Sequence, residues 1–167
     1  MRIEPLRSAD APEVEAMLDA AFGADRRTRT AYRLRAGSAP IAGLSLAARD
    51  ETGALAGSLQ CWPIVLLTPA GTVHPLVLLG AVAVASQRQG EGIGSALMRA
   101  CLARAGTAPM LLIGDAPYYA RFDFSAARTA HWLLPGPVDR ARLLARSVDA
   151  IPAAGTVAPA WQRRKAA

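Results

Sequence analysis

Apolar residues recur every three to four positions over residues 11–22, and this period predicts an amphipathic helix. Its apolar positions are Val14, Met17, Leu18, Ala21 and Phe22. Asp10 precedes the pattern as a predicted N-cap, with Pro12 in the first turn and Glu13 three residues further on. Gly23 supplies a stop signal. We therefore expect a helix that packs its apolar stripe on a core.

An arginine-rich segment follows at residues 25–35, and it predicts a second helix that ends at Gly37. A basic run of this kind is most often a solvated helix face. Contact with an anionic ligand is the alternative interpretation.

From Leu44 onward the apolar residues recur at every second position, which predicts β-strands. Three apolar runs at residues 44–50, 54–68 and 72–84 are separated by Gly-containing turns at 51–53 and 69–71. They predict an antiparallel meander. Pro63 indicates that the second strand is bent, bulged or at an edge there. The end of the third run is apolar on both faces, as in a central strand.

A helical pattern at 93–105 and a short apolar run at 110–113 come next. The helix presents Ile93, Ala96, Leu97, Ala100 and Cys101 on one face. Because strand, helix and strand alternate, we expect the strands around 77–84 and 110–113 to be parallel. Asp115 predicts the cap of another short helix with Pro117 at its start.

Less regular patterns fill the rest of the chain. We expect residues 121–136 to continue as sheet edge and 138–148 to be helical, whereas the tail 152–167 carries no clear pattern. No repeat or linker interrupts the 167 residues, so a single domain over 1–167 is predicted. The fold class is α/β (mixed α+β), with antiparallel N-terminal strands, a parallel central pair and flanking helices.

Composition excludes several classes of protein. Hydrophobic residues at 52% and charged residues at 19% exclude a disordered chain. Two cysteines provide neither a disulfide framework nor a zinc-ribbon spacing, and no metal site is expected. Acidic residues near the N-terminus and the lack of a long apolar run predict a soluble, cytoplasmic protein with no membrane partner.

The net charge of +6 favours an anionic partner without identifying it. All but one of the cationic side chains are arginine, which is also typical of a GC-rich genome. Nucleic-acid binding, suggested by the basic tail at 161–165, is a minor hypothesis because no recognition helix or aromatic-basic strand accompanies it. Glu91 is the only acid between Glu51 and Asp115, so a site built from that stretch is electropositive.

A glycine-spaced turn between the central strand and the helix at 93–105 is the strongest chemical signal. Gly90, Gly92 and Gly94 alternate at the helix start. Such a turn presents backbone N–H groups and the positive end of the helix dipole, which together bind phosphate. A turn that merely tightens strand-to-helix packing is the alternative. The spacing fits neither a Walker loop, which needs a following lysine, nor the dinucleotide GxGxxG motif.

Residues 89–94, Gln-Gly-Glu-Gly-Ile-Gly, resemble the Q/R-x-x-G-x-G/A signature of the GCN5-related N-acetyltransferases (GNAT). The register starting at Gln87 also fits this expression. A second segment, Gly114 to Phe124, resembles the Tyr-x-x-x-Gly-Phe region of the family, and it is closest to a bacterial subset that reads GDPxYYxRFGF. The resemblance covers residues 2–134 in element order, and its specific part is 79–124.

The resemblance implies an acyl-CoA N-acyltransferase fold and acetyl-CoA as cosubstrate, with no metal. It places the pantetheine and the diphosphate of CoA along the central strand and the following turn, on Val82, Ala83, Val84, Gln89, Gly90, Glu91, Gly92, Ile93, Gly94 and Ser95. An amine attacks the thioester directly in this family, and a tyrosine protonates the leaving thiolate. Tyr119 matches that position, with Tyr118 as the rival.

Two considerations bear on the tyrosine. On a regular helix Tyr118 and Phe122 share a face, which leaves Tyr119 turned away from them, and this favours Tyr119 as the acid. Packing roles for both are the alternative. Asp123 stands where the family has glycine.

The acceptor and the general base are less defined by the sequence. His74 and His131 are candidate bases, although a lone histidine is more often a packing or surface residue. The predicted function is transfer of acetyl from acetyl-CoA to a primary amine of a small molecule or peptide, with no nucleic-acid partner and with a homodimer left open. A degenerate CoA- or acyl-CoA-binding module without turnover is the alternative, motivated by Asp123 and the unassigned base.

Overall fold

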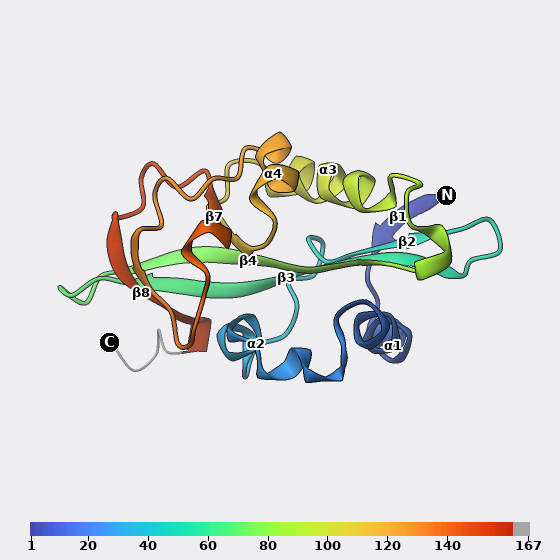
Figure 1. The fold of residues 1–167 in the computed structure, drawn as a ribbon, viewed down its shortest axis with the longest axis horizontal. Coiled ribbons are helices and arrows are strands. Elements are labelled where there is room, and N and C mark those ends of the chain that lie inside the picture. The colour runs from blue at the N-terminus through green and yellow to red at the C-terminus, as the bar shows by residue number, and fades with distance from the viewer. Residues whose placement is uncertain (162–167) are drawn as a thin grey trace. The chain divides into compact units, whose positions relative to one another are not determined.

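The computed structural model describes residues 1–161 and shows a mixed α/β fold with helices on a mixed sheet (Figure 1). The strands are β1 (Arg2–Pro5), β2 (Leu46–Arg49), β3 (Leu55–Leu67), β4 (Val73–Val84), β5 (Met110–Ile113), β6 (His131–Leu133), β7 (Leu143–Arg146) and β8 (Ala154–Pro159). The helices are α1 (Ala11–Phe22), α2 (Thr30–Arg35), α3 (Ile93–Ala105) and α4 (Ala116–Tyr119). Both long helices and the three-stranded meander predicted from the hydrophobic pattern are confirmed.

The chain forms two compact units, and β3 and β4 contribute residues to both. The first unit contains residues 1–27, 40–61 and 80–106. In it β2 pairs antiparallel with β1 and with the first part of β3, as the predicted hairpin requires. Gly53 closes the β2–β3 turn with a positive φ of 89°, a conformation that glycine adopts without steric cost.

Helices α1 and α3 cover opposite faces of the strands of the first unit (Figure 1). On one face Val14 and Leu18 of α1 pack with Ala83 of β4. On the other face a Cβ added to Gly57 of β3 would lie 2.9 Å from a methyl of Ile93, so α3 approaches the backbone of β3 closely. Only glycine permits this approach without displacement.

Two charged clusters stabilise the first unit. Arg49 on β2 and Asp10 before α1 are both buried and form an ion pair of 2.5 Å. Asp10 precedes α1 as predicted, but its carboxylate accepts the Arg7 backbone N–H rather than an amide of the helix, which corrects the expected cap. Burial raises the pKa of Asp10, and the hydrogen bonds from Arg7 and Arg49 outweigh it, so the pKa lies below its usual value.

The arginine-rich segment before α2 also differs from the expectation of a solvated face. Arg26 is 1% exposed and donates to Glu15 at 2.5 Å and to Asp19 at 2.7 Å, both on α1. These carboxylates are four residues apart and therefore lie on one face of α1, where a single guanidinium reaches both. The segment itself is a short 3₁₀ turn over Ala24–Thr28 followed by α2 rather than one continuous helix.

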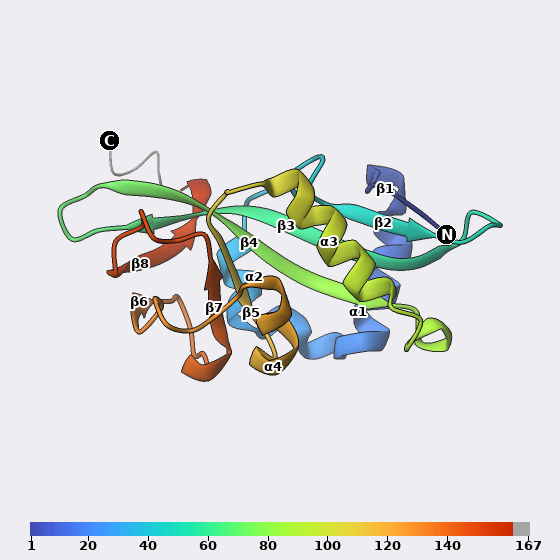
Figure 2. The ribbon, with the colours of Figure 1, turned by 90° about the horizontal axis from the view of Figure 1, so that it is seen from above.

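The second unit contains residues 28–39, 62–79 and 107–161 of the described chain. Here β4 pairs parallel with β5, as predicted, and β5 pairs antiparallel with β7 (Figure 2). The second part of β3 pairs with β8 from Ile64 onward, and β6 pairs with β8. Pro63 lies just before this ladder and after the β2 ladder, which ends at Leu59, so its missing N–H is tolerated.

Two predicted elements of the second unit are wrong. Residues 138–148 are not helical: a 3₁₀ turn at 140–142 leads into β7, because Leu143, Leu144 and Ala145 are buried against a sheet partner, β5, that is distant in sequence. Of the predicted sheet edge at 121–136, β6 and a single bridge at Ser125 are β-structure. In the tail, β8 was not predicted, and residues 162–167 lie outside the described residues.

Within residues 1–161, every helix is too short or too polar to cross a lipid bilayer.

Candidate functional site

The turn between β4 and α3 has the backbone conformation that the glycine spacing predicts. Gly90 and Gly92 have φ values of 85° and 76°, and Gly92 is the N-cap of α3. A Cβ at either position would meet no atom within 4 Å, so the glycines are required by conformation rather than by packing inside the protein. This observation argues against the interpretation that the turn only tightens strand-to-helix packing.

The same turn presents unused hydrogen-bond donors. Over the part of the chain that the structure describes, the backbone N–H groups of residues 90–94 donate no hydrogen bond to backbone or side chain. Residues 89–92 are exposed. The positive end of the α3 dipole lies at the same turn and adds to the positive potential of the N–H groups. Successive free amides at an exposed helix start can bind a diphosphate.

Side-chain charge at this turn is largely neutralised. Arg88 donates to both carboxylate oxygens of Glu91, at 2.6 and 2.7 Å, and lies 3.8 Å from Asp50. The hydrogen bonds from Arg88 hold the pKa of the Glu91 carboxyl below its usual value, so Glu91 is ionised and paired. An incoming anion would therefore meet the backbone amides without an unpaired carboxylate beside them.

The end of β4 offers backbone groups next to this turn. The β4–β5 ladder covers Val77 and Leu78 of β4, and in the described residues it does not continue along Val82 to Val84. Val82 and Val84 are half-buried, while Ala83 faces the α1 core. A ligand amide can therefore pair with β4 at the residues that the sequence predicts.

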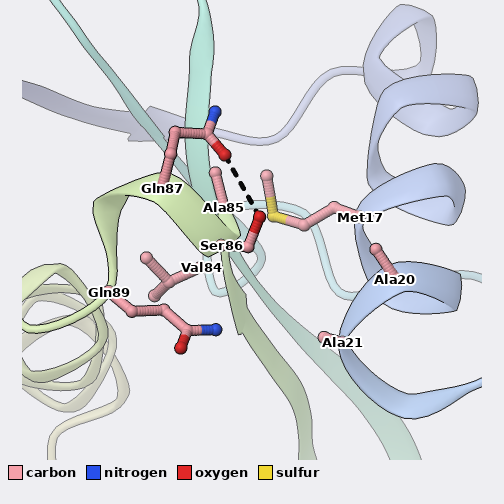
Figure 3. Close-up of a pocket in the computed structure, with 8 residues that line it drawn as sticks. All are labelled: Met17, Ala20, Ala21, Val84, Ala85, Ser86, Gln87 and Gln89. Carbon is pink, nitrogen blue, oxygen red and sulfur yellow. Dashed lines mark hydrogen bonds between the residues drawn. The ribbon is translucent and has the colours of Figure 1, made fainter.

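A cavity of about 190 Å³ lies beside the turn, within the first unit (Figure 3). One wall is α1, and the other is the chain from the end of β4 to the glycine turn. The lining residues are Met17, Ala20, Ala21, Val84, Ala85, Ser86, Gln87 and Gln89. Val84 and Gln89 were predicted from the sequence, and the others were missed because nothing in the sequence relates α1 to residues 84–89.

Tyr119 lies in the second unit at the end of α4, which Asp115 caps by accepting the Tyr118 backbone N–H at 3.1 Å. The Tyr119 ring packs against Gly114 and against Phe124, with ring centroids 6.3 Å apart in the second contact. Burial raises the pKa of Tyr119 to about 12, so the phenol keeps its proton at neutral pH. A proton donor needs this state.

Tyr118 differs from its neighbour in its contacts. Its ring centroid lies 5.8 Å from that of Phe122, which confirms the predicted i, i+4 packing. The Arg121 guanidinium also lies over the Tyr118 ring, 4.8 Å from its centroid. These contacts give Tyr118 a packing role. The Tyr119 ring is packed as well, with its centroid 4.9 Å from that of Tyr118, so the choice of Tyr119 as the acid stays a prediction.

Asp123 adopts the left-handed conformation, with φ of 65°. Aspartate tolerates this region better than most residues, although glycine does so at lower cost. The substitution at this position therefore keeps a backbone turn that glycine would also adopt.

The candidate bases are distributed over other elements. His74 is half-buried on β4, and His131 is exposed on β6. Among residues 1–161, no three His, Cys, Asp or Glu side chains gather as a metal site would need.

The chain is similar to known acetyltransferases in sequence and in structure. The family described as Acetyltransferase (GNAT) domain matches residues 2–127. A GNAT family acetyltransferase from Brucella melitensis, solved with acetyl-CoA, is 30% identical, with a TM-score of 0.63, and the match covers 94% of each chain. The GNAT family N-acetyltransferase YhbS from Escherichia coli, solved with CoA, is 22% identical, with a TM-score of 0.73 over 98% of this chain and 91% of that one.

A more distant fold similarity is to Arabidopsis thaliana Naa50, solved with a bisubstrate analogue, at 13% identity and a TM-score of 0.55 over 86% of this chain and 94% of that one. No curated protein matches the chain.

Proposed function

The chain belongs to the GNAT family of acetyltransferases, and we propose that it transfers an acetyl group from acetyl-CoA directly to a primary amine. The observation that carries this proposal is the turn at residues 90–94, whose backbone N–H groups donate no hydrogen bond within the described chain and whose residues 90–92 are exposed. The Brucella relative, solved with acetyl-CoA, supports acetyl-CoA as the donor.

Donor binding is assigned to the end of β4 and to the glycine turn. The amides of residues 90–94 hold the diphosphate, and Gln89 and Ser95 flank them. The pantetheine amides pair with the backbone of Val82 and Val84. No side-chain cation is needed, because the turn supplies the donors and the α3 dipole supplies the positive potential.

The chemical step has three parts. The neutral amine attacks the thioester carbonyl carbon, and the carbonyl oxygen becomes an oxyanion. A backbone N–H of β4 stabilises that oxyanion, a type of contact worth about 3 kcal/mol in other acyl-transfer enzymes. The intermediate then expels the thiolate, which takes the proton of the Tyr119 hydroxyl as CoA leaves. The attacking nitrogen, positively charged after the attack, loses a proton, and this proton restores the Tyr119 phenol through solvent. This role for Tyr119 is supported by its match to the family segment.

We assign the whole of residues 1–167 to one such domain in a soluble, cytoplasmic protein. The acceptor is a small molecule or peptide. We also propose that the chain belongs to the bacterial subset of the family whose segment reads GDPxYYxRFGF, which residues 114–124 resemble.

A catalytically inactive CoA-binding module is the second candidate. One reason to consider this candidate is that Asp123 stands where the family has glycine. Because Asp123 adopts the left-handed backbone conformation that glycine would also adopt, this reason is weakened. The two functions differ in turnover and not in CoA binding.

The test combines calorimetric titration of acetyl-CoA with a thiol-release assay over a panel of primary amines. We expect binding of acetyl-CoA and amine-dependent release of CoA. Binding without release for any amine would support the inactive module, and absence of binding would overturn both candidates.

A further inference from the structure

We propose that Cys61 of β3 and Cys101 of α3 form a reversible disulfide when the protein is exposed to peroxide, and that this bond stabilises the folded chain by tying α3 to the sheet. The proposed bond does not depend on acetyl transfer, because neither cysteine belongs to the residues assigned to acetyl-CoA or to proton donation.

The two sulfur atoms already lie next to each other. The Sγ atoms of Cys61 and Cys101 are 3.5 Å apart, although the residues are 40 positions apart in the sequence. A disulfide joins sulfur atoms at about 2.05 Å, so an approach of about 1.5 Å closes the bond. The chain contains two cysteines, so no third thiol of the same molecule competes for either of them.

The packing of α3 on β3 produces this approach. A Cβ added to Gly57 of β3 would lie 2.9 Å from Ile93 and 3.2 Å from Leu97, both on α3. Cys101 follows Leu97 by four positions and therefore lies on the same helix face, while Cys61 follows Gly57 by four positions on the same strand face. The helix and the strand thus run along each other from Gly57 to the thiol pair.

The backbone at both cysteines is fixed by hydrogen bonds within the first unit. The Cys61 N–H donates to Oγ of Ser45 at 3.0 Å, and its carbonyl accepts the Ile41 N–H at 2.7 Å. Cys101 lies inside the helix that ends at Ala105. The remaining approach of the sulfur atoms therefore falls mainly to side-chain rotation.

Burial determines how fast the pair reacts. Both cysteines are fully buried. The hydrogen bond with Cys101 and burial raise the pKa of the Cys61 thiol, so it stays protonated in the folded protein. Because the thiolate is the reactive form, oxidation requires local opening of the contact and is slow. The closed contact shields the disulfide from external thiols in the same way.

The chemistry balances with hydrogen peroxide as the oxidant. The first thiol loses its proton, and its sulfur attacks a peroxide oxygen. The O–O bond breaks, and the departing hydroxide takes that proton and leaves as water, with a sulfenic acid on the protein. The second sulfur then attacks the sulfenic sulfur, so that the S–S bond forms and the S–O bond breaks. The released hydroxide takes the proton of the second thiol. Two thiols lose two electrons and two protons, and one peroxide becomes two water molecules.

The bond should stabilise the fold through the unfolded chain. It closes a loop between positions 40 apart in the sequence, which includes β4 and the glycine turn. Such a loop has less conformational freedom when the chain unfolds, and we expect Tm to rise by roughly 10 °C for a chain of this size.

The experiment treats the fully reduced wild type with hydrogen peroxide under native conditions. After the peroxide is removed, free thiols are counted in urea, peptide mass spectrometry identifies the bond, and calorimetry measures Tm. We expect both thiols to be lost, a Cys61–Cys101 bond within one chain, and the rise in Tm. Dithiothreitol should reverse all three changes.

Cys61→Ala and Cys101→Ala are matched controls, since each removes one sulfur and keeps an apolar side chain in the contact. Neither variant can form the bond, so peroxide should leave its Tm without a rise. The peptide map and the Tm of the wild type still decide the matter if a variant fails to fold.

Three results would overturn the proposal. The wild type could keep both thiols at a peroxide dose that oxidises the urea-unfolded chain. Its thiols could react otherwise, by a bond between two molecules or by conversion to sulfinic acid. The bond could also form within one chain and leave Tm unchanged or lower.

Discussion

The proposed proton transfer to the leaving thiolate depends on one side chain, the Tyr119 hydroxyl. Tyr119→Phe removes the hydroxyl and keeps the ring packing against Gly114 and Phe124. Because a positioned general acid contributes about 10² to 10⁴ in rate, we expect kcat to fall by about a hundredfold with the Kd for acetyl-CoA unchanged.

Tyr118→Phe is the matched control, and steady-state kinetics with calorimetry measure both variants. A Tyr119→Phe protein as fast as the wild type, or a larger loss for Tyr118→Phe, would contradict the assignment.

Gly114 determines the placement of the Tyr119 ring. A Cβ at this position would lie 2.3 Å from Cε2 of Tyr119, so Gly114→Ala must displace the ring or the backbone. We predict a lower kcat with little change in the Kd for CoA, which the turn at 90–94 sets. Kinetic and binding measurements on one preparation separate these effects.

Gly136→Ala is a suitable comparison, because its Cβ would lie 2.6 Å from Oγ1 of Thr30, in the same unit. Both variants should lose thermal stability. Equal losses of kcat in the two variants would show that Gly114 has no particular relation to the acid.

The turn between β4 and α3 is proposed to bind the diphosphate through its backbone. The double variant Arg88→Gln/Glu91→Gln removes the ion pair and keeps the net charge of the turn. If the amides of residues 90–94 supply the binding energy, we expect the Kd for CoA to change by less than about threefold, or roughly 0.6 kcal/mol.

Titration calorimetry at two salt concentrations measures this Kd. A weakening of more than about tenfold would show that the Arg88 side chain, and not the backbone, binds the diphosphate.

The elements that the sequence predicted correctly share a physical basis. Helices α1 and α3 have a local hydrophobic period, and strands β2 to β5 are apolar runs bounded by turns or by a helix, so neighbouring residues alone indicate these elements. Strand β7 has no such local signal. Its Leu143 and Leu144 are fixed by pairing with β5, more than thirty residues earlier, and a short apolar run fits either a helix or a strand.

The residues of the candidate site likewise divide into those with a local sequence signal and those without one. The glycine turn could be predicted, since three glycines alternate next to a strand and a helix. The α1 side of the cavity could not, because Met17, Ala20 and Ala21 read as ordinary helix residues until the fold places them beside residues 84–89. The burial of Arg26 was missed likewise, although Glu15 and Asp19 at i, i+4 were a usable signal.

The whole chain carries a net charge of +6, but several arginines already have carboxylate partners. Arg26, Arg27, Arg49 and Arg88 all lie in ion pairs. These four side chains are not available to an anionic partner without breaking an ion pair, and the proposed anion site uses backbone donors.

The two compact units share β3 and β4, and this continuity predicts cooperative unfolding. Disorder in one unit would remove the supporting part of both strands from the other. We expect one calorimetric transition, with the calorimetric and van't Hoff enthalpies equal. CoA at 100 times its Kd should stabilise the protein by roughly 2.7 kcal/mol. Two separate transitions, with only one moved by CoA, would contradict the assignment of one domain.

The most direct test of the proposed donor site is amide NMR of the ¹⁵N-labelled protein during titration with CoA. The account predicts that the backbone N–H signals of Gly90, Glu91, Gly92, Ile93 and Gly94 shift together and saturate with the calorimetric Kd, as free amides acquire a phosphate acceptor. Saturable binding of CoA that leaves these five signals unmoved would contradict it.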